Sequence, residues 1–86
     1  MAYEVELTPA AQRQWKSFDK PIQRQLLQRV TSLADNPRPN GVEKLQDADD
    51  LYRIRSGNYR IIYTINDKKL LVLIVKIGDR KEVYKR

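Results

Sequence analysis

Residues 51–65 constrain the fold most, because apolar and basic residues alternate there on both sides of a short turn at 56–58. Such alternation is typical of half-buried β-strands, and the turn joins two of them into a hairpin. We predict that Arg55 lies opposite Arg60. The same register pairs Arg53 with Ile62, Ile54 with Ile61 and Tyr52 with Tyr63. Since opposed residues share one face of a sheet, the hairpin gathers Arg53, Arg55 and Arg60 on one face and apolar side chains on the other.

Helical periodicity, proline and turn residues predict the other elements. We expect a strand over 3–7, helices over 9–18 and from Pro21 to the Asn36-Pro37 stop, a loop over 36–50, strands over 51–55, 59–65 and 70–77, and a short charged segment over 80–86 that can add one more strand. This order predicts an α+β fold, β-α-α-β-β-β(-β), with both helices on one face of the sheet. A chain of 86 residues fits a single domain over 1–86.

The chain contains neither cysteine nor histidine. This composition excludes disulfides, thiolate nucleophiles, zinc sites of the Cys/His type and histidine general bases. We therefore expect no metal site and no cofactor. The longest apolar run, 70–75, is far shorter than the roughly 20 residues of a membrane span, and the N-terminus lacks the pattern of a signal peptide. A cytoplasmic protein without a membrane partner is expected.

The positive charge is concentrated in the second half of the sequence. Residues 51–86 hold ten basic and three acidic residues, a net charge of +7, whereas residues 1–50 hold seven basic and eight acidic ones, a net charge of −1. Such a concentration is typical of a phosphate-binding surface, and a solvated basic face is the alternative. Crowding of Arg53, Arg55 and Arg60 on one sheet face destabilises the sheet, which favours an anionic ligand.

Two segments together resemble the RelE/ParE toxin superfamily: LYRIRSGNYRIIY at 51–63 and VLIVKIGDRKEVY at 72–84. The resemblance covers the whole chain. It is closer to the RelE branch, the ribosome-dependent mRNA endonucleases of toxin–antitoxin pairs. It implies a small, twisted, mainly antiparallel sheet with two N-terminal helices on one face and an active site on the concave basic side.

The resemblance also implies roles for individual residues. Arg53 and Arg55 would bind and polarise the scissile phosphate, Arg60 would stabilise the transition state, and Arg80 and Tyr84 would act as acid and base. Basic residues outside this set are expected to bind RNA: Lys44, which matches a family lysine, and Lys81, Lys85 and Arg86, which extend the positive surface.

The implied chemistry uses the 2′-OH of RNA as nucleophile. Tyr84 would have to lose a proton from a group whose pKa is ordinarily about 10, and neighbouring arginines lower that pKa. Two features depart from the family pattern. Arg53 and Arg55 stand where relatives often have lysine, and arginine cannot act as a base. Asp79 precedes Arg80 and could hold it in an ion pair, or simply form a turn.

The implied function is that of the toxin of a type II toxin–antitoxin system that cuts mRNA in the ribosomal A site. Its partners would be the ribosome, mRNA and a small acidic, RelB-like antitoxin, with operator DNA contacted only through the antitoxin. We expect the antitoxin to cover the basic face and an exposed row of Leu70, Val72 and Ile74. The alternatives are a ParE-like inhibitor of DNA gyrase that acts by binding alone, and an inactive nucleic-acid-binding relative.

Overall fold

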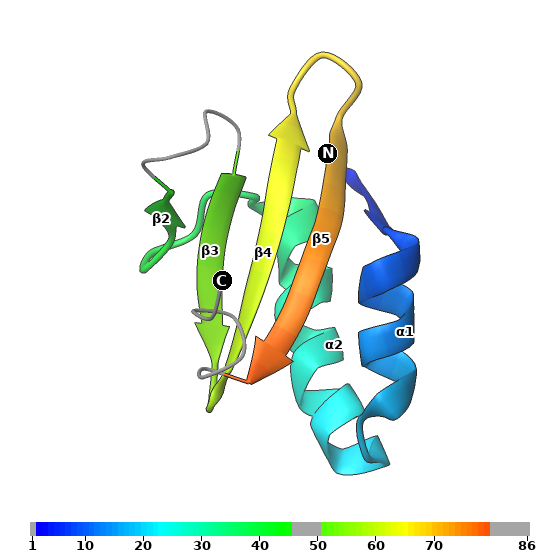
Figure 1. Cartoon of the computed structure of the whole chain (residues 1–86). Helices are drawn as coiled ribbons and strands as arrows, with labels where there is room; N and C mark the ends of the chain where they lie inside the picture. Colours follow the sequence, from blue (N-terminus) through cyan, green and yellow to red (C-terminus); the bar gives the residue numbers. More distant parts are fainter. Residues whose placement is uncertain (1, 46–50, 80–86) are drawn as a thin grey trace.

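The computed structural model describes residues 2–45 and 51–79. Along the chain these residues form β1 (Glu4–Leu7), α1 (Pro9–Ser17), α2 (Lys20–Asp35), β2 (Glu43–Lys44), β3 (Leu51–Ser56), β4 (Tyr59–Asn66) and β5 (Leu71–Asp79). Figure 1 shows the strands side by side in one sheet. The predicted helices and the strands before and after them are confirmed. The prediction that 36–50 holds no strand is wrong, because β2 lies within it, and the segment 80–86 lies outside the described residues.

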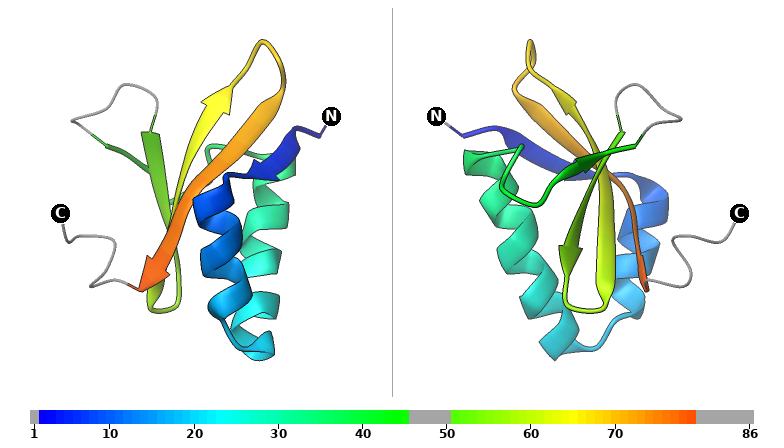
Figure 2. Two further views of the ribbon diagram at one scale, coloured as in Figure 1. Left: turned by 45° about the vertical axis from the view of Figure 1, so that its right-hand side comes forward. Right: turned by 90° about the vertical axis from the view of Figure 1, so that its left-hand side faces the viewer.

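The five strands of the described sheet run in the order β1-β5-β4-β3-β2. β1 pairs with β5 in parallel, and the three other neighbouring pairs are antiparallel. Both helices lie on the same side of this sheet (Figure 2). The α+β, mainly antiparallel architecture is therefore confirmed. No helix in the described part of the chain is long and apolar enough to cross a membrane.

The helices begin where the sequence supplies caps and prolines. The Thr8 hydroxyl accepts a hydrogen bond from the Ala11 N–H at 3.2 Å and donates one to the Val75 carbonyl at 3.0 Å. It therefore caps α1 and ties its first turn to β5. A proline also lies in the first turn of each helix, where its missing N–H is tolerated.

The core lies between the helices and the sheet face that they cover. Its buried residues come from both layers: Ala11, Leu26, Val30, Leu33, Ile54, Ile61, Tyr63, Val72, Ile74 and Ile77. The expectation of an exposed row of Leu70, Val72 and Ile74 is wrong for two of the three, because Val72 and Ile74 are fully buried and only Leu70 is exposed.

A β-bulge in β5 decides which of its side chains face the core. Ile62 pairs with Lys76 but the next residue of β4, Tyr63, pairs with Ile74, so Val75 is the extra residue. The bulge shifts the alternation of β5 by one residue. As a result both Ile74 and Ile77 point into the core, and Lys76 points to the open face of the sheet.

A polar cluster fastens the segment before β2 to the sheet. We call Tyr3, Arg38 and Asp67 the Asp67 clasp: Arg38 donates two hydrogen bonds to the carboxylate at 3.2 and 3.0 Å, and the Tyr3 hydroxyl donates one at 2.7 Å. The bonded guanidinium of Arg38 and the Tyr3 hydroxyl hold the pKa of Asp67 below its ordinary value of 3.8. Nearby, the buried hydroxyl of Tyr63 donates to the Pro37 carbonyl at 2.7 Å.

Candidate functional site

The β3–β4 hairpin has the register predicted from its alternation. Arg55 pairs with Arg60, Arg53 with Ile62, Ile54 with Ile61 and Tyr52 with Tyr63. Ile54, Ile61 and Tyr63 are buried against the helices, so the three arginines leave the strands on the opposite, open face. We call that part of the open face, with Arg53, Arg55, Arg60 and the residues paired beside them, the arginine face.

A tight turn holds the two strands of the hairpin together. Gly57 has a φ of 61°, and a Cβ at this position would lie 2.5 Å from the Gln25 side-chain nitrogen. The same nitrogen donates a hydrogen bond to the Ser56 carbonyl at 2.9 Å. The positive φ favours glycine here, and a larger residue would also have to displace the end of the Gln25 side chain. The helix layer thereby fixes the end of the hairpin that carries Arg55 and Arg60.

A small pocket lies at this end of the hairpin. Its volume is about 40 Å³, and it is lined by Arg55, Gly57, Asn58, Tyr59 and Arg60. Because a water molecule needs roughly 10–15 Å³ by this kind of measure, the pocket admits a few water-sized groups, such as the oxygens of a phosphate. Two arginines at its wall make it suited to an anion.

Arg60 is buried, with 2% of its surface exposed. Its place beside Arg53 and Arg55 on one sheet face did not predict this burial. Arg60 lies on β4, which has β3 on one side and β5 on the other. Its partner in β5 is Gly78. Since a guanidinium stays charged at all ordinary pH values, Arg60 provides a positive charge that is fixed in place rather than free to move in solvent.

The structure adds a carboxylate to the arginine face. Glu43 pairs with Arg53 across β2 and β3, and its Oε1 accepts hydrogen bonds from both Nε and Nη2 of Arg53. The bonded Arg53 guanidinium, with further help from the charges of Arg55 and Arg60, lowers the pKa of Glu43 below its ordinary value. Sequence reasoning missed Glu43, because a two-residue strand within a loop shows no periodicity.

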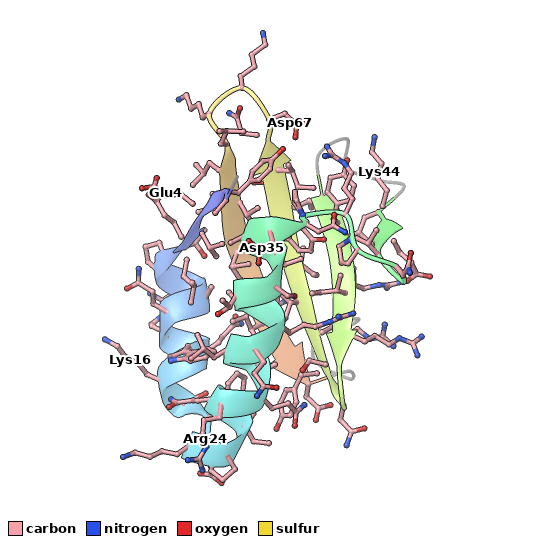
Figure 3. The ribbon with its side chains drawn as sticks, turned by 180° about the vertical axis from the view of Figure 1, so that it is seen from behind. Glu4, Lys16, Arg24, Asp35, Lys44 and Asp67 are labelled. Carbon is pink, nitrogen blue, oxygen red and sulfur yellow. The ribbon has the colours of Figure 1, made fainter. Side chains whose placement is uncertain are left out.

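Two lysines lie on different faces. Lys76 pairs with Ile62, which itself pairs with Arg53, so Lys76 is a fourth cation on the arginine face. Sequence reasoning did not single out this lysine. Lys44 pairs with Tyr52, and its side chain therefore leaves the edge of the sheet on the other face (Figure 3). The structure does not bring Lys44 together with the three arginines.

Comparison with known proteins identifies the family. The model of the family described as the ParE toxin of type II toxin–antitoxin systems, parDE, matches residues 5–84. The chain belongs to this family, within the RelE/ParE toxin superfamily. It is RelE-like, because the mRNA interferase toxin RelE of Escherichia coli strain K12 is 31% identical over 88 residues, covering 98% of this chain and 92% of the relative.

Solved structures agree with this assignment of a RelE-like toxin. The archaeal RelE–RelB complex from Pyrococcus horikoshii OT3 contains a chain that is 33% identical, with a TM-score of 0.81 over 93% of this chain and 97% of that one. A chain of the intact E. coli RelBE toxin–antitoxin complex is 28% identical, with a TM-score of 0.79 over 91% of this chain and 96% of that one.

The described residues hold one part of the candidate site of this RelE-like toxin. Arg53, Arg55 and Arg60 lie together on the arginine face, as predicted. The other predicted members lie outside the described residues: Arg80, Tyr84, Lys81, Lys85 and Arg86. Asp79 is the last residue of β5 and pairs with Tyr59 rather than forming a turn, and its predicted ion-pair partner Arg80 lies outside the described residues. Within 2–45 and 51–79 no three carboxylates gather into a candidate metal site.

Proposed function

We propose that this RelE-like toxin is a ribosome-dependent endoribonuclease, which cuts mRNA in the ribosomal A site by attack of the 2′-OH on the adjacent phosphate without a metal ion. The observation that carries the proposal is the arginine-lined pocket of the hairpin, where Arg55 and Arg60 lie opposite each other. The names of relatives support it, since the E. coli K12 protein that matches nearly the whole chain is an mRNA interferase.

The arginines supply charge stabilisation in this mechanism. Attack on the phosphorus adds negative charge to the phosphoryl oxygens, and fixed positive donors stabilise that charge most effectively where they need not reorganise. Buried Arg60 meets this requirement. Exposed Arg55 would bind the phosphate at the mouth of the pocket, and Arg53 would contact a neighbouring phosphate or the same one.

Proton transfer is assigned to residues outside the described part of the chain. In the proposed mechanism Tyr84 takes the proton of the 2′-OH, and Arg80 assists the leaving 5′ oxygen. A tyrosine is a weak base at neutral pH, so the alignment of mRNA by the ribosome must contribute much of the rate. RNA would be positioned by further cations: Lys76 on the arginine face, Lys44 at the sheet edge, and Lys81, Lys85 and Arg86.

The proposed partner in the resting cell is an acidic antitoxin similar to RelB. The Pyrococcus horikoshii and E. coli structures that resemble this chain are RelE–RelB complexes. An antitoxin that covers the arginine face would block RNA, and operator DNA would be contacted through the antitoxin. Because its target is the ribosome, the toxin is proposed to act in the cytoplasm.

The test uses ribosomes that carry a defined mRNA and a vacant A site. Wild-type protein should cut this mRNA, leave a 2′,3′-cyclic phosphate or the derived 3′-phosphate, and leave naked RNA nearly intact. A single 2′-deoxy nucleotide on the 5′ side of the cut should abolish cleavage there. The Tyr84→Phe variant should bind programmed ribosomes but cut slowly. Equal cutting of naked RNA, or cutting next to the 2′-deoxy nucleotide, would refute the mechanism.

One observation favours a second candidate function. The family model that matches the chain is described as a ParE toxin, and our sequence-based alternative is a ParE-like inhibitor of DNA gyrase. A supercoiling assay separates the two functions. Inhibition of purified gyrase at toxin concentrations that leave mRNA on ribosomes intact would favour the ParE-like function.

A further inference from the structure

Glu43 occupies a position on the arginine face that an RNA phosphate would also favour. Its carboxylate accepts hydrogen bonds from both Nε and Nη2 of Arg53. This is the pair of donors with which arginine holds a phosphate. The strand pairing of β2 with β3 directs Glu43 to this face.

The two partners of the ion pair differ in exposure. The side chain of Arg53 is 17% exposed, whereas that of Glu43 is 57% exposed. Arg53 is therefore held by its surroundings, and Glu43 is the partner that can turn away into solvent. Ion pairs of this exposed kind are weak, so a phosphate can displace the carboxylate.

The remaining arginines act on the same carboxylate. The charges of Arg55 and Arg60 contribute, after Arg53, to the lowered pKa of Glu43. Glu43 therefore lies within the positive field of the whole face and stays ionised at neutral pH.

We infer that Glu43 is an internal competitor of the RNA phosphate: it holds Arg53 in the free toxin, must release it when RNA binds, and so limits the affinity of the arginine face. This inference rests on the proposed function, because it takes an RNA phosphate as the ligand of that face. Glu43 acts through Arg53 and is a positioning residue.

The size of the effect follows from counterion release. Each additional phosphate contact on single-stranded nucleic acid steepens the slope of log K against log salt by about 0.7. If Glu43→Gln frees Arg53 for one more contact, the affinity should rise about fivefold at 0.1 M salt, and the slope should steepen by about 0.7. A purely structural role of Glu43 would not move the salt slope.

The experiment measures fluorescence anisotropy of a labelled 12-nucleotide single-stranded RNA with 2′-O-methyl groups, which cannot be cleaved, between 0.05 and 0.3 M KCl (roughly the range over which such slopes are read). The matched control is Glu4→Gln, which changes net charge by the same amount. Glu4 lies on β1, at the opposite edge of the sheet from β2 (Figure 3). Four strand spacings separate them, about 19 Å, or nearly two Debye lengths at 0.1 M salt.

The full set comprises the wild type, the single variants Glu43→Gln, Glu43→Ala, Glu4→Gln and Arg53→Gln, and the double variant Glu43→Gln/Arg53→Gln. Glu43→Gln should bind about fivefold more tightly with the steeper slope, and Glu43→Ala should show the same gain. Glu4→Gln should bind like wild type. In the Arg53→Gln background, Glu43→Gln should give little gain. Thermal melts confirm that each variant is folded.

Three results would overturn the inference: no gain from Glu43→Gln, an equal gain from Glu4→Gln, or a gain that persists without Arg53. A failure of the proposed nuclease function would give a different set of results. If the wild-type toxin does not cut mRNA on ribosomes but Glu43→Gln still binds RNA more tightly through Arg53, the nuclease activity is refuted while the competition between Glu43 and RNA stands.

Discussion

Replacing Arg55 with glutamine is expected to separate catalysis from folding. Arg55 is exposed, it lines the pocket together with Arg60, and its partner in the hairpin ladder is Arg60. The variant keeps most of the aliphatic stem and loses the charge. We expect the rate of mRNA cleavage on programmed ribosomes to fall by about 10²–10³, the usual cost of removing one donor from a developing oxyanion.

The expected change in stability is small, for reasons that the geometry supplies. Side chains directly opposite each other have Cβ atoms about 5 Å apart. Two unit charges about 7 Å apart repel by about 0.6 kcal/mol at the dielectric constant of water, and physiological salt lowers this to about 0.25 kcal/mol. Loss of this repulsion stabilises the variant, and loss of the attraction between Arg55 and Glu43 opposes the gain. We therefore expect the melting temperature to change by less than about 4 °C.

The assay compares Arg55→Gln with Arg13→Gln, which removes an exposed arginine from α1 on the far side of the sheet. Circular dichroism gives the melting temperature, and single-turnover cleavage gives the rate. The control should match wild type in both measurements. Cleavage by Arg55→Gln within about threefold of wild type would show that Arg55 does not contact the reacting phosphate, since a lost donor costs far more.

Three further outcomes are expected. Arg60→Ala should lower the free energy of unfolding by about 2–4 kcal/mol because a buried side chain is removed. Arg60→Lys should stay folded but cleave mRNA more slowly. Denaturant titrations measure the stability of both variants, and cleavage assays measure their rates. Tyr63→Phe should cost about 1–2 kcal/mol, since the Pro37 carbonyl loses its donor, and urea unfolding measures this. The pKa of Asp67 is lower in the folded protein than its ordinary value of 3.8, so its bond to Arg38 stabilises the fold fully above pH 3.8 and loses that effect as pH falls through the folded-state pKa. Asp67→Asn should therefore be less stable than wild type at neutral pH. Thermal melts at a series of pH values should show this difference shrinking below about pH 4.

The hairpin could be predicted residue by residue, because its alternation leaves one acceptable register. A slip of β3 by one residue would expose Ile54 and bury Arg53. The placement of the three arginines follows from that register. Their exposure does not follow from it, because alternation assigns a side chain to a face and says nothing of how deeply that side chain is buried there, as Arg60 shows. Charged residues are ordinarily exposed, so no local pattern marks this exception.

Which side chains of β5 face the core could not be predicted in the same way. Residues 70–75 are apolar throughout, so neither face is distinguished by polarity. The bulge at Val75 then reverses the alternation, which buries Ile74 and Ile77 together and adds Lys76 to the arginine face. No residue type at 75 marks a bulge. The role of Glu43 could not be predicted either, because no sequence pattern marks β2, a two-residue strand that pairs with β3.

The parallel pairing of β1 with β5 has a consequence for the timing of synthesis. β1 is made first, yet its neighbour in the sheet is the last described strand, and α1 packs on that same strand. At about 5–20 residues per second, β1 waits about 3–13 s for β5 to emerge. Until then the nascent chain has a cationic hairpin but no completed core beneath it. The sheet of this toxin can therefore close only after β5 has left the ribosome.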